Sequence, residues 1–173
     1  MAEGRVVVGV SGSLGSLAAL RAGAREARLA GRELVAVTAW APPEGEGMYA
    51  RSPDRAWAAV WEVEARRTLD RAFEQAFGGT PPGLTPTRLV VRDDAVRALC
   101  AVAAQPGDLL VVGARPRPRR FGRGGRVGRG LRGRAVCPVL TVPTLPPDPR
   151  EVRRLRRATP EDFRPVRGAS RPS

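Results

Sequence analysis

Apolar residues in this chain gather in short runs, each of a length typical of a β-strand. The run LLVVG, from Leu109 to Gly113, is continuous rather than alternating and is closed by a glycine. That pattern favours a strand buried on both faces of a parallel sheet. The predicted strands are Arg5 to Gly12, Glu33 to Trp40, Thr87 to Val91, Leu109 to Gly113 and Cys137 to Pro143.

Segments with helical periodicity separate these runs. Each has residues typical of helix ends, since serine and aspartate cap helix starts and glycine commonly ends helices. The segment before the longest predicted helix is rich in proline and glycine, so we expect a loop there. The four predicted helices run from Ser13 or Ser16 to Gly31, from Asp54 to Phe77, from Asp93 or Asp94 to about Gln105, and from about Arg126 to Val136.

Strands that alternate with helices favour right-handed crossovers and a parallel sheet with helices on both faces. We therefore predict one α/β domain over residues 1–143, with a doubly wound, Rossmann-like sheet of five strands. Residues 144–173 are rich in proline and arginine and poor in apolar residues. Such a composition cannot bury much apolar surface, so we expect a disordered tail.

A loop rich in glycine and arginine joins the last two predicted strands. Its glycines let the backbone approach a ligand closely. A helix that starts near Arg126 would aim free N–H groups and a partial positive charge at such a ligand. This is the chemistry of a phosphate or anion site.

The charge of the chain is unevenly distributed. The formal net charge is +13, yet residues 1–112 hold 13 arginines and 13 acids, whereas residues 113–173 hold 17 arginines and 4 acids. The excess therefore lies in the final third. The chain has no lysine, so arginine is its default cation and a single arginine is weak evidence for bidentate recognition.

Several classes of chemistry are excluded by composition. Histidine is absent, which removes Ser-His and Cys-His nucleophile pairs and imidazole zinc ligands. Cys100 and Cys137 lie inside apolar segments, and we expect both to be reduced core residues. No apolar run is long enough for a membrane helix and the N-terminus lacks a signal-peptide pattern, so we expect a cytoplasmic protein.

Three stretches resemble the universal stress protein family: VVVGVSGSLGSLAALRAGAREA, DLLVVGAR and GRVGRGLRGRAVCPVLTVP. The family's first strand typically reads VVGVDGS, and its later text reads DLLVVGSRG and then GSVS…CPVLVV. The resemblance implies the strand order 3-2-1-4-5. It also implies a ligand crevice at the carboxyl ends of strands one and four, where the strand order reverses.

Nucleotide-binding members of the family have an acid at the end of the first strand and a loop of the form G-x2-G-x9-G-[ST]. Here Ser11 stands in the place of the acid, and Gly113 keeps the first loop glycine. Pro116 replaces the second glycine, Gly125 comes one position early for the third, and Arg126 replaces the Ser or Thr. Proline lacks an N–H and fixes φ, so the loop has lost part of the family's usual set of contacts to the ATP phosphates.

The resemblance assigns a candidate site for ATP or another phosphate-bearing anion, with no catalytic residue and no metal. Its members are Ser11, Gly113, Ala114, Arg115, Gly124, Gly125, Arg126 and Val127. Two explanations fit the many arginines of this loop. In the first, the arginines are a solvated face of an arginine-rich protein. In the second, they hold an anion that neutralises Arg126 at a helix N-terminus, where the dipole disfavours a cation.

Other motifs receive structural interpretations. SGSLGS, from Ser11 to Ser16, resembles the SGGxDS pyrophosphate loop of N-type ATP pyrophosphatases, but two of its key residues differ and we interpret it as a helix-capping turn. The stripe Trp57, Trp61, Phe73 and Phe77 is predicted to pack in the core. Asp93 and Asp94 are predicted to cap a helix rather than bind a metal, and Asp108 to start its strand.

The resemblance implies a non-enzymatic stress-response protein that senses a ligand or binds a partner, with weak or absent ATP binding. One alternative is a true ATP binder with slow hydrolysis. Another is a basic module whose tail gives salt-sensitive, sequence-independent binding to nucleic acid or polyphosphate. The strand Cys137 to Val142 would be an apolar, uncharged sheet edge, so we expect a homodimer formed through it.

Overall fold

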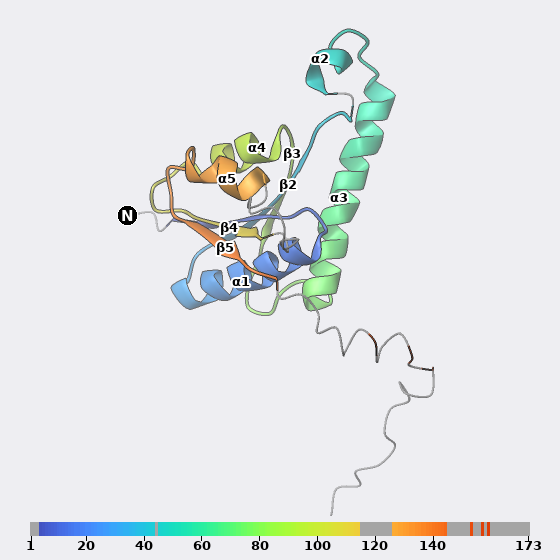
Figure 1. Cartoon of the computed structure of the whole chain (residues 1–173). Helices are drawn as coiled ribbons and strands as arrows, with labels where there is room; N and C mark the ends of the chain where they lie inside the picture. The colour runs from blue at the N-terminus through green and yellow to red at the C-terminus, as the bar shows by residue number, and fades with distance from the viewer. Residues whose placement is uncertain are drawn as a thin grey trace, which may run out of the picture.

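The computed structural model describes residues 4–43, 45–114 and 126–144 and the single residues 153, 157 and 159. The strands form one parallel sheet in the order β3-β2-β1-β4-β5, which confirms the predicted topology (Figure 1). The strands are β1 (Val6–Gly9), β2 (Leu34–Trp40), β3 (Thr87–Arg92), β4 (Leu109–Gly113) and β5 (Val139–Val142). The helices are α1 (Leu14–Ala30), α2 (Glu46–Tyr49), α3 (Arg55–Phe77), α4 (Ala95–Val102) and α5 (Arg126–Arg132).

The ends of the long helices follow the predicted capping chemistry. Ser13 caps α1, since its hydroxyl accepts a hydrogen bond from the Ser16 amide. Asp54 and Asp94 cap α3 and α4 through their carboxylates in the same way. Gly31 ends α1 in the left-handed region at φ 63°, a conformation that costs glycine little.

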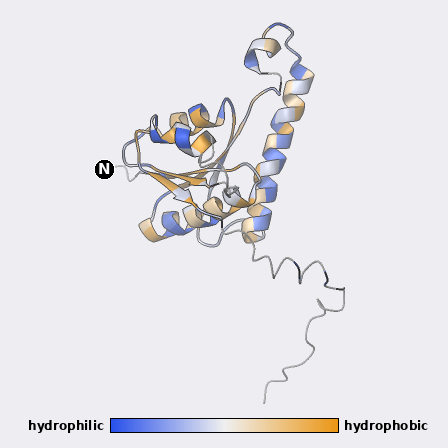
Figure 2. Cartoon of the chain, in the orientation of Figure 1, coloured by the Kyte–Doolittle hydropathy of each residue, from blue (hydrophilic) through white to orange (hydrophobic). Residues whose placement is uncertain are grey.

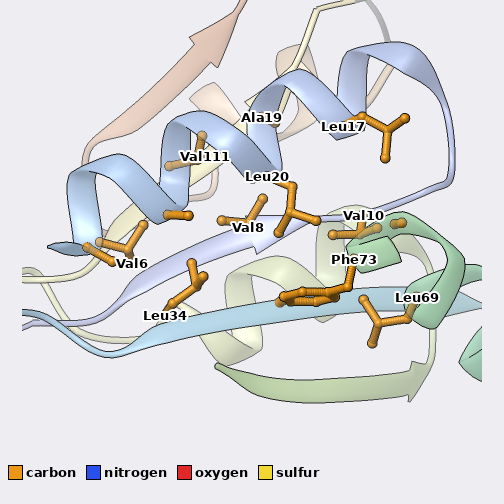
Figure 3. Close-up of a cluster of buried hydrophobic side chains, with 14 residues drawn as sticks. Val6, Val8, Val10, Leu17, Ala19, Leu20, Leu34, Leu69, Phe73 and Val111 are labelled. Carbon is orange, nitrogen blue, oxygen red and sulfur yellow. The ribbon is translucent and has the colours of Figure 1, made fainter. Parts of the chain in front are cut away.

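The helices cover both faces of the sheet, as right-handed crossovers on a doubly wound sheet require. Helices α1 and α3 pack on one face and enclose an apolar cluster centred on Val8, Leu20 and Phe73 (Figure 3). Helices α4 and α5 cover the other face, over a cluster that includes Leu99 and Leu131. In Figure 2 the strands between these layers carry hydrophobic colouring, whereas the helices carry hydrophilic stretches as well.

Several predicted boundaries are wrong by a few residues. Within the predicted loop, Glu46 to Tyr49 form the short helix α2, held by contacts distant in sequence. Its Glu46 carboxylate accepts hydrogen bonds from the Arg92 guanidinium, which also lies 4.4 Å from the ring centre of Tyr49. The helix predicted to reach Gln105 ends at Val102, and the one predicted to reach Val136 ends at Arg132.

The predicted core packing of the aromatic stripe is half wrong. Phe73 is fully buried and Phe77 packs against the same cluster, but Trp57 is 58% exposed. Trp61 is half-buried, with its ring 6.3 Å from those of Trp40 and Trp57. The reason is length. The N-terminal half of α3 extends past the main body of the sheet (Figure 1). All the residues that α3 buries lie toward its other end, from Ala65 to Phe73.

Asp108 does more than start its strand. Its side chain is fully buried and accepts hydrogen bonds from the Arg5 amide at 2.8 Å, the Arg5 guanidinium at 3.2 Å and the Gln105 amide at 3.2 Å. Burial is the largest influence on this carboxyl and opposes its ionisation, but these hydrogen bonds together outweigh it and lower the pKa of Asp108. The cluster ties the starts of β1 and β4 together.

We predict that Asp108→Asn lowers the free energy of unfolding by about 2 kcal/mol, because charge-assisted hydrogen bonds to a buried carboxylate are lost. Since the folded-state pKa of Asp108 is lowered, its contribution is complete at neutral pH and is lost as pH falls below about 4. The variant should therefore lose less stability in acid than the natural chain.

Urea unfolding at neutral and acid pH measures both effects. The control is Asp70→Asn, which removes an exposed partner of Arg88 and should cost under about 1 kcal/mol. An equal loss in the two variants would contradict the role of the buried cluster.

Candidate functional site

The strand order reverses between β1 and β4. Helix α1 leads from β1 to its neighbour β2, and α5 leads from β4 to β5 on the opposite side. The two strands run in parallel and in register from Val6 opposite Leu109 to Val8 opposite Val111. Their carboxyl ends therefore lie side by side, at the place where ligands bind in open α/β sheets.

The turn from β1 into α1 carries exposed hydroxyl groups. Ser11 is exposed, and its hydroxyl lies 3.1 Å from that of Ser13. Gly12 has φ 74°, and a Cβ atom there would lie 3.1 Å from Thr68 of α3. The turn is thus held between α1 and α3, with the Ser11 hydroxyl at the surface.

The start of α1 has no negative charge. Its first turn contains no acid, and Ser13 satisfies two of its amides, those of Ser16 and Leu17. The remaining first-turn N–H groups have no partner within the helix, because a helix leaves its first amides free. The end of α1 at this edge therefore presents a partial positive charge.

The end of β4 touches the start of α1 backbone to backbone. A Cβ atom on Gly113 would lie 2.2 Å from the carbonyl of Gly15, and one on Gly15 would lie 2.9 Å from the carbonyl oxygen of Ala114. No side chain fits at either position. This close approach places the end of β4 beside the positive end of α1.

Ala114 is placed at this edge, but its amide is already used. Its N–H donates to the Val142 carbonyl at 2.7 Å, and its carbonyl accepts a hydrogen bond from the Thr144 hydroxyl at 3.3 Å. The chain after β4 is thereby fastened to the end of β5. The first amide after Gly113 is not free to hold a phosphate.

The other predicted site residues divide into two groups. Arg115, Gly124 and Gly125 lie outside the described residues, as does the predicted tail apart from its few described positions. Arg126 is the first residue of α5. The side chain of Val127 packs against the apolar cluster under α4 and α5, so its backbone is the part that can serve a ligand.

Thr38 is a residue that the sequence analysis did not select. It is 5% exposed near the end of β2, and among the described residues its hydroxyl is the buried side-chain group that lacks a hydrogen-bond partner. The register places it beside Val10, one residue before Ser11. A threonine within the apolar run ELVAVTAW is the signal that could have found it.

Other chemistry finds little support in the described part of the chain. Cys100 and Cys137 are free thiols, and burial raises the pKa of both, so they are poor nucleophiles. No cluster of three acids or thiols that could hold a metal ion occurs there. Nor does that part contain a helix with the length and apolar character needed to cross a bilayer.

The sequence profile of the universal stress protein family matches residues 4–143. The chain belongs to the universal stress protein family. The match spans β1 to β5 and therefore includes both strands that frame the candidate site. A comparison with curated protein sequences found no match.

Solved structures agree with this membership. A universal stress protein in complex with cAMP is 27% identical, with a TM-score of 0.59, over 82% of this chain and 98% of that one. The universal stress protein from Archaeoglobus fulgidus is 23% identical, with a TM-score of 0.58, over 80% and 98%. A family protein from Burkholderia pseudomallei is 22% identical, with a TM-score of 0.54, over 82% and 97%. The last two likenesses show the shared fold.

We predict that Gly113→Ala lowers the free energy of unfolding of this universal stress protein by about 2 kcal/mol, because the added methyl group overlaps the Gly15 backbone. The matched control is Gly128→Ala in α5. A Cβ atom there meets no atom within 4 Å, and alanine is the better helix former by about 1 kcal/mol. Thermal melts of the two variants compare them, and coincident curves would rule out the close backbone contact.

Proposed function

We propose that this universal stress protein acts without catalysis in a stress response, by sensing a ligand or binding a partner. Its site takes a phosphate-bearing anion at the carboxyl ends of β1 and β4 and binds ATP weakly or not at all. The observation that carries the proposal is the contact between Gly15 and Gly113. It sets the uncompensated N-terminus of α1 beside the end of β4.

Weak ATP binding is supported by what the site lacks. Ser11 offers a hydroxyl where nucleotide-binding relatives have a carboxylate. The Ala114 amide is taken by the Val142 carbonyl. Pro116 has no N–H to offer, and Arg126 replaces the hydroxyl residue of the family motif. Each change removes one of the contacts by which a triphosphate would be held.

Anion binding is supported by charge and by hydroxyl groups. The first turn of α1 has no acid, and α5 opens with Arg126 and likewise has no acid in its first turn. Exposed Ser11 can donate a hydrogen bond at this edge, and the buried hydroxyl of Thr38 in the neighbouring strand β2 lacks a partner among the described residues. The relative solved with cAMP holds a ligand that combines one phosphate with a ribose and a base. A site for one phosphate needs fewer hydrogen-bond donors than a site for a triphosphate.

We further propose that the chain forms a homodimer through the free edge of β5. Each end of the sheet has one edge strand, β3 or β5. β3 carries Arg88 and Arg92, and charged residues discourage edge pairing. β5 reads VLTV, has no charge and leaves Leu140 37% exposed. An uncharged apolar edge is the one of the two that a second copy would cover.

We predict that a phosphate-bearing ligand raises the melting temperature at low salt, since a ligand that binds the folded state at about 100 times its Kd adds about 2.7 kcal/mol. cAMP, inorganic phosphate, polyphosphate and ATP are compared by thermal shift. Arg126→Ser should reduce the shift, whereas Arg129→Ser, on the exposed side of the same helix, should leave it unchanged. A melting temperature that none of these ligands changes would contradict the proposed anion site.

Native mass spectrometry of freshly purified protein distinguishes the ATP-binding alternative. ATP that remains bound through purification would show that the contacts to the triphosphate are retained, and it would contradict the proposal that ATP binds weakly. Anion binding without ATP supports the site proposed above.

We predict that Leu140→Arg weakens self-association through β5, because it places a charge on the edge that the second copy would cover. The control is Leu29→Arg on α1, where the leucine is 77% exposed and far from β5 in the sheet order. Sedimentation velocity at micromolar concentration measures the change. No difference between the two variants would refute the β5 interface.

A further inference from the structure

The outward face of α3 carries an apolar stripe. Ala56, Ala59, Val60 and Val63 follow the spacing i, i+3, i+4, i+7, which aligns them on one side of a helix. All four are exposed, Val60 by 55% and Val63 by 46%. These four residues are called the α3 stripe below. Trp57, which is 58% exposed, lies next to it.

The α3 stripe is not part of the domain's core. The lower half of α3 buries Ala65, Leu69, Ala72 and Phe73. The N-terminal half extends past the main body of the sheet, with α2 near the end of the helix (Figure 1). There the helix already has a covered side, where Trp61 packs against Trp40 of β2. The α3 stripe is a second apolar side that nothing in the described part of the chain covers.

A contiguous exposed apolar surface on a helix commonly marks an interaction site. The residue sizes favour another helix as the occupant. Ala56 and Ala59 are small, so a facing helix can approach to an axis separation of about 8 Å. Val60 and Val63 then supply side chains that fill the spaces beside the alanines. The α3 stripe therefore has both the small residues that admit a facing helix and the larger residues that fill the space beside it.

Charges beside the stripe favour a second copy in antiparallel orientation. At 100° per residue, Arg55 and Glu62 lie on the same flank of the α3 stripe. When two copies of α3 cross antiparallel near Ala59 and Val60, Arg55 of each copy comes within a turn of Glu62 of the other. Arg55 makes no ion pair among the described residues, and Glu62 pairs only with exposed Arg66. The pairing also sets the two helix dipoles in opposite directions.

We propose that the α3 stripe is a self-association surface, on which α3 of a second copy of this chain packs antiparallel. The contact buries Val60 and Val63 at its centre and part of Trp57 at its margin. It is bordered on the other flank by two symmetry-related pairs of Arg55 with Glu62. It is distinct from the β5 edge, because α3 packs on β2 and β3 at the other side of the sheet.

Sedimentation equilibrium of the full chain in the Leu140→Arg background tests the surface apart from β5. We expect the Leu140→Arg variant to remain a dimer at micromolar concentration. Adding Val60→Glu and Val63→Glu should raise the dissociation constant by at least about tenfold, which corresponds to about 1.4 kcal/mol. Adding Leu29→Glu instead, at another exposed leucine, should leave it unchanged.

A monomer in the Leu140→Arg background, or equal dissociation constants for the two added changes, would overturn the proposal. A surface that serves a different protein would give the first of these results. Circular dichroism melts check that each variant is folded, which is expected since all the changed side chains are exposed.

The charge pairs provide a second test that does not depend on apolar residues. Arg55→Glu and Glu62→Arg should each weaken the dimer, and the double variant should recover most of the loss, because the partners are exchanged. A double variant as weak as the sum of the single variants would exclude the antiparallel register.

Tryptophan fluorescence gives an independent readout. The three tryptophans of the chain are Trp40, Trp57 and Trp61. Trp61 packs against both of the others, and Trp57 lies next to the α3 stripe. Quenching by acrylamide should fall as the concentration rises through the dissociation constant, because Trp57 becomes shielded. Quenching that is constant over that range would count against the contact.

Discussion

The close approach of Gly15 and Gly113 is the constraint on which the arrangement of this domain depends. It lets α1 lie directly on the end of β4 as well as on β1, so one helix spans the point where the strand order reverses. The cluster around Leu20 and Phe73 is closed beneath that helix. The same approach brings the positive end of α1 to the edge where a ligand would bind. One backbone contact thus serves both the core and the candidate site.

The sequence predicts the elements well where local signals and tertiary structure agree. Valine-rich runs became strands, and Ser13 and Asp54 cap helices as their chemistry favours. Prediction from the sequence failed where residues far apart in the chain determine the local structure. The helix α2 is bound through Glu46 by Arg92, 46 residues further along the chain, and the buried carboxylate of Asp108 is satisfied by Arg5, 103 residues away. Helical spacing predicted an apolar side for α3, but only the sheet determines which part of that side is covered.

The candidate site shows the same division. Ser11 and Gly113 could be selected from the sequence because a family motif marks them, and the fold brings their strands together. The motif does not reveal that the Ala114 amide is committed to Val142, since that bond forms across two strands. Nor does it mark Thr38, whose unpartnered hydroxyl becomes significant only when its burial is known. Spacing identifies a site, but the availability of its donors is a property of the folded chain.

The two proposed self-association surfaces lie at different sides of the sheet, and this has a consequence for assembly. β5 is one edge strand, and α3 covers β2 and β3 near the other edge. A surface that pairs with itself about a twofold axis gives a dimer, and a second such surface elsewhere on the molecule joins those dimers. The candidate site lies between the two surfaces, at the junction of β1 and β4.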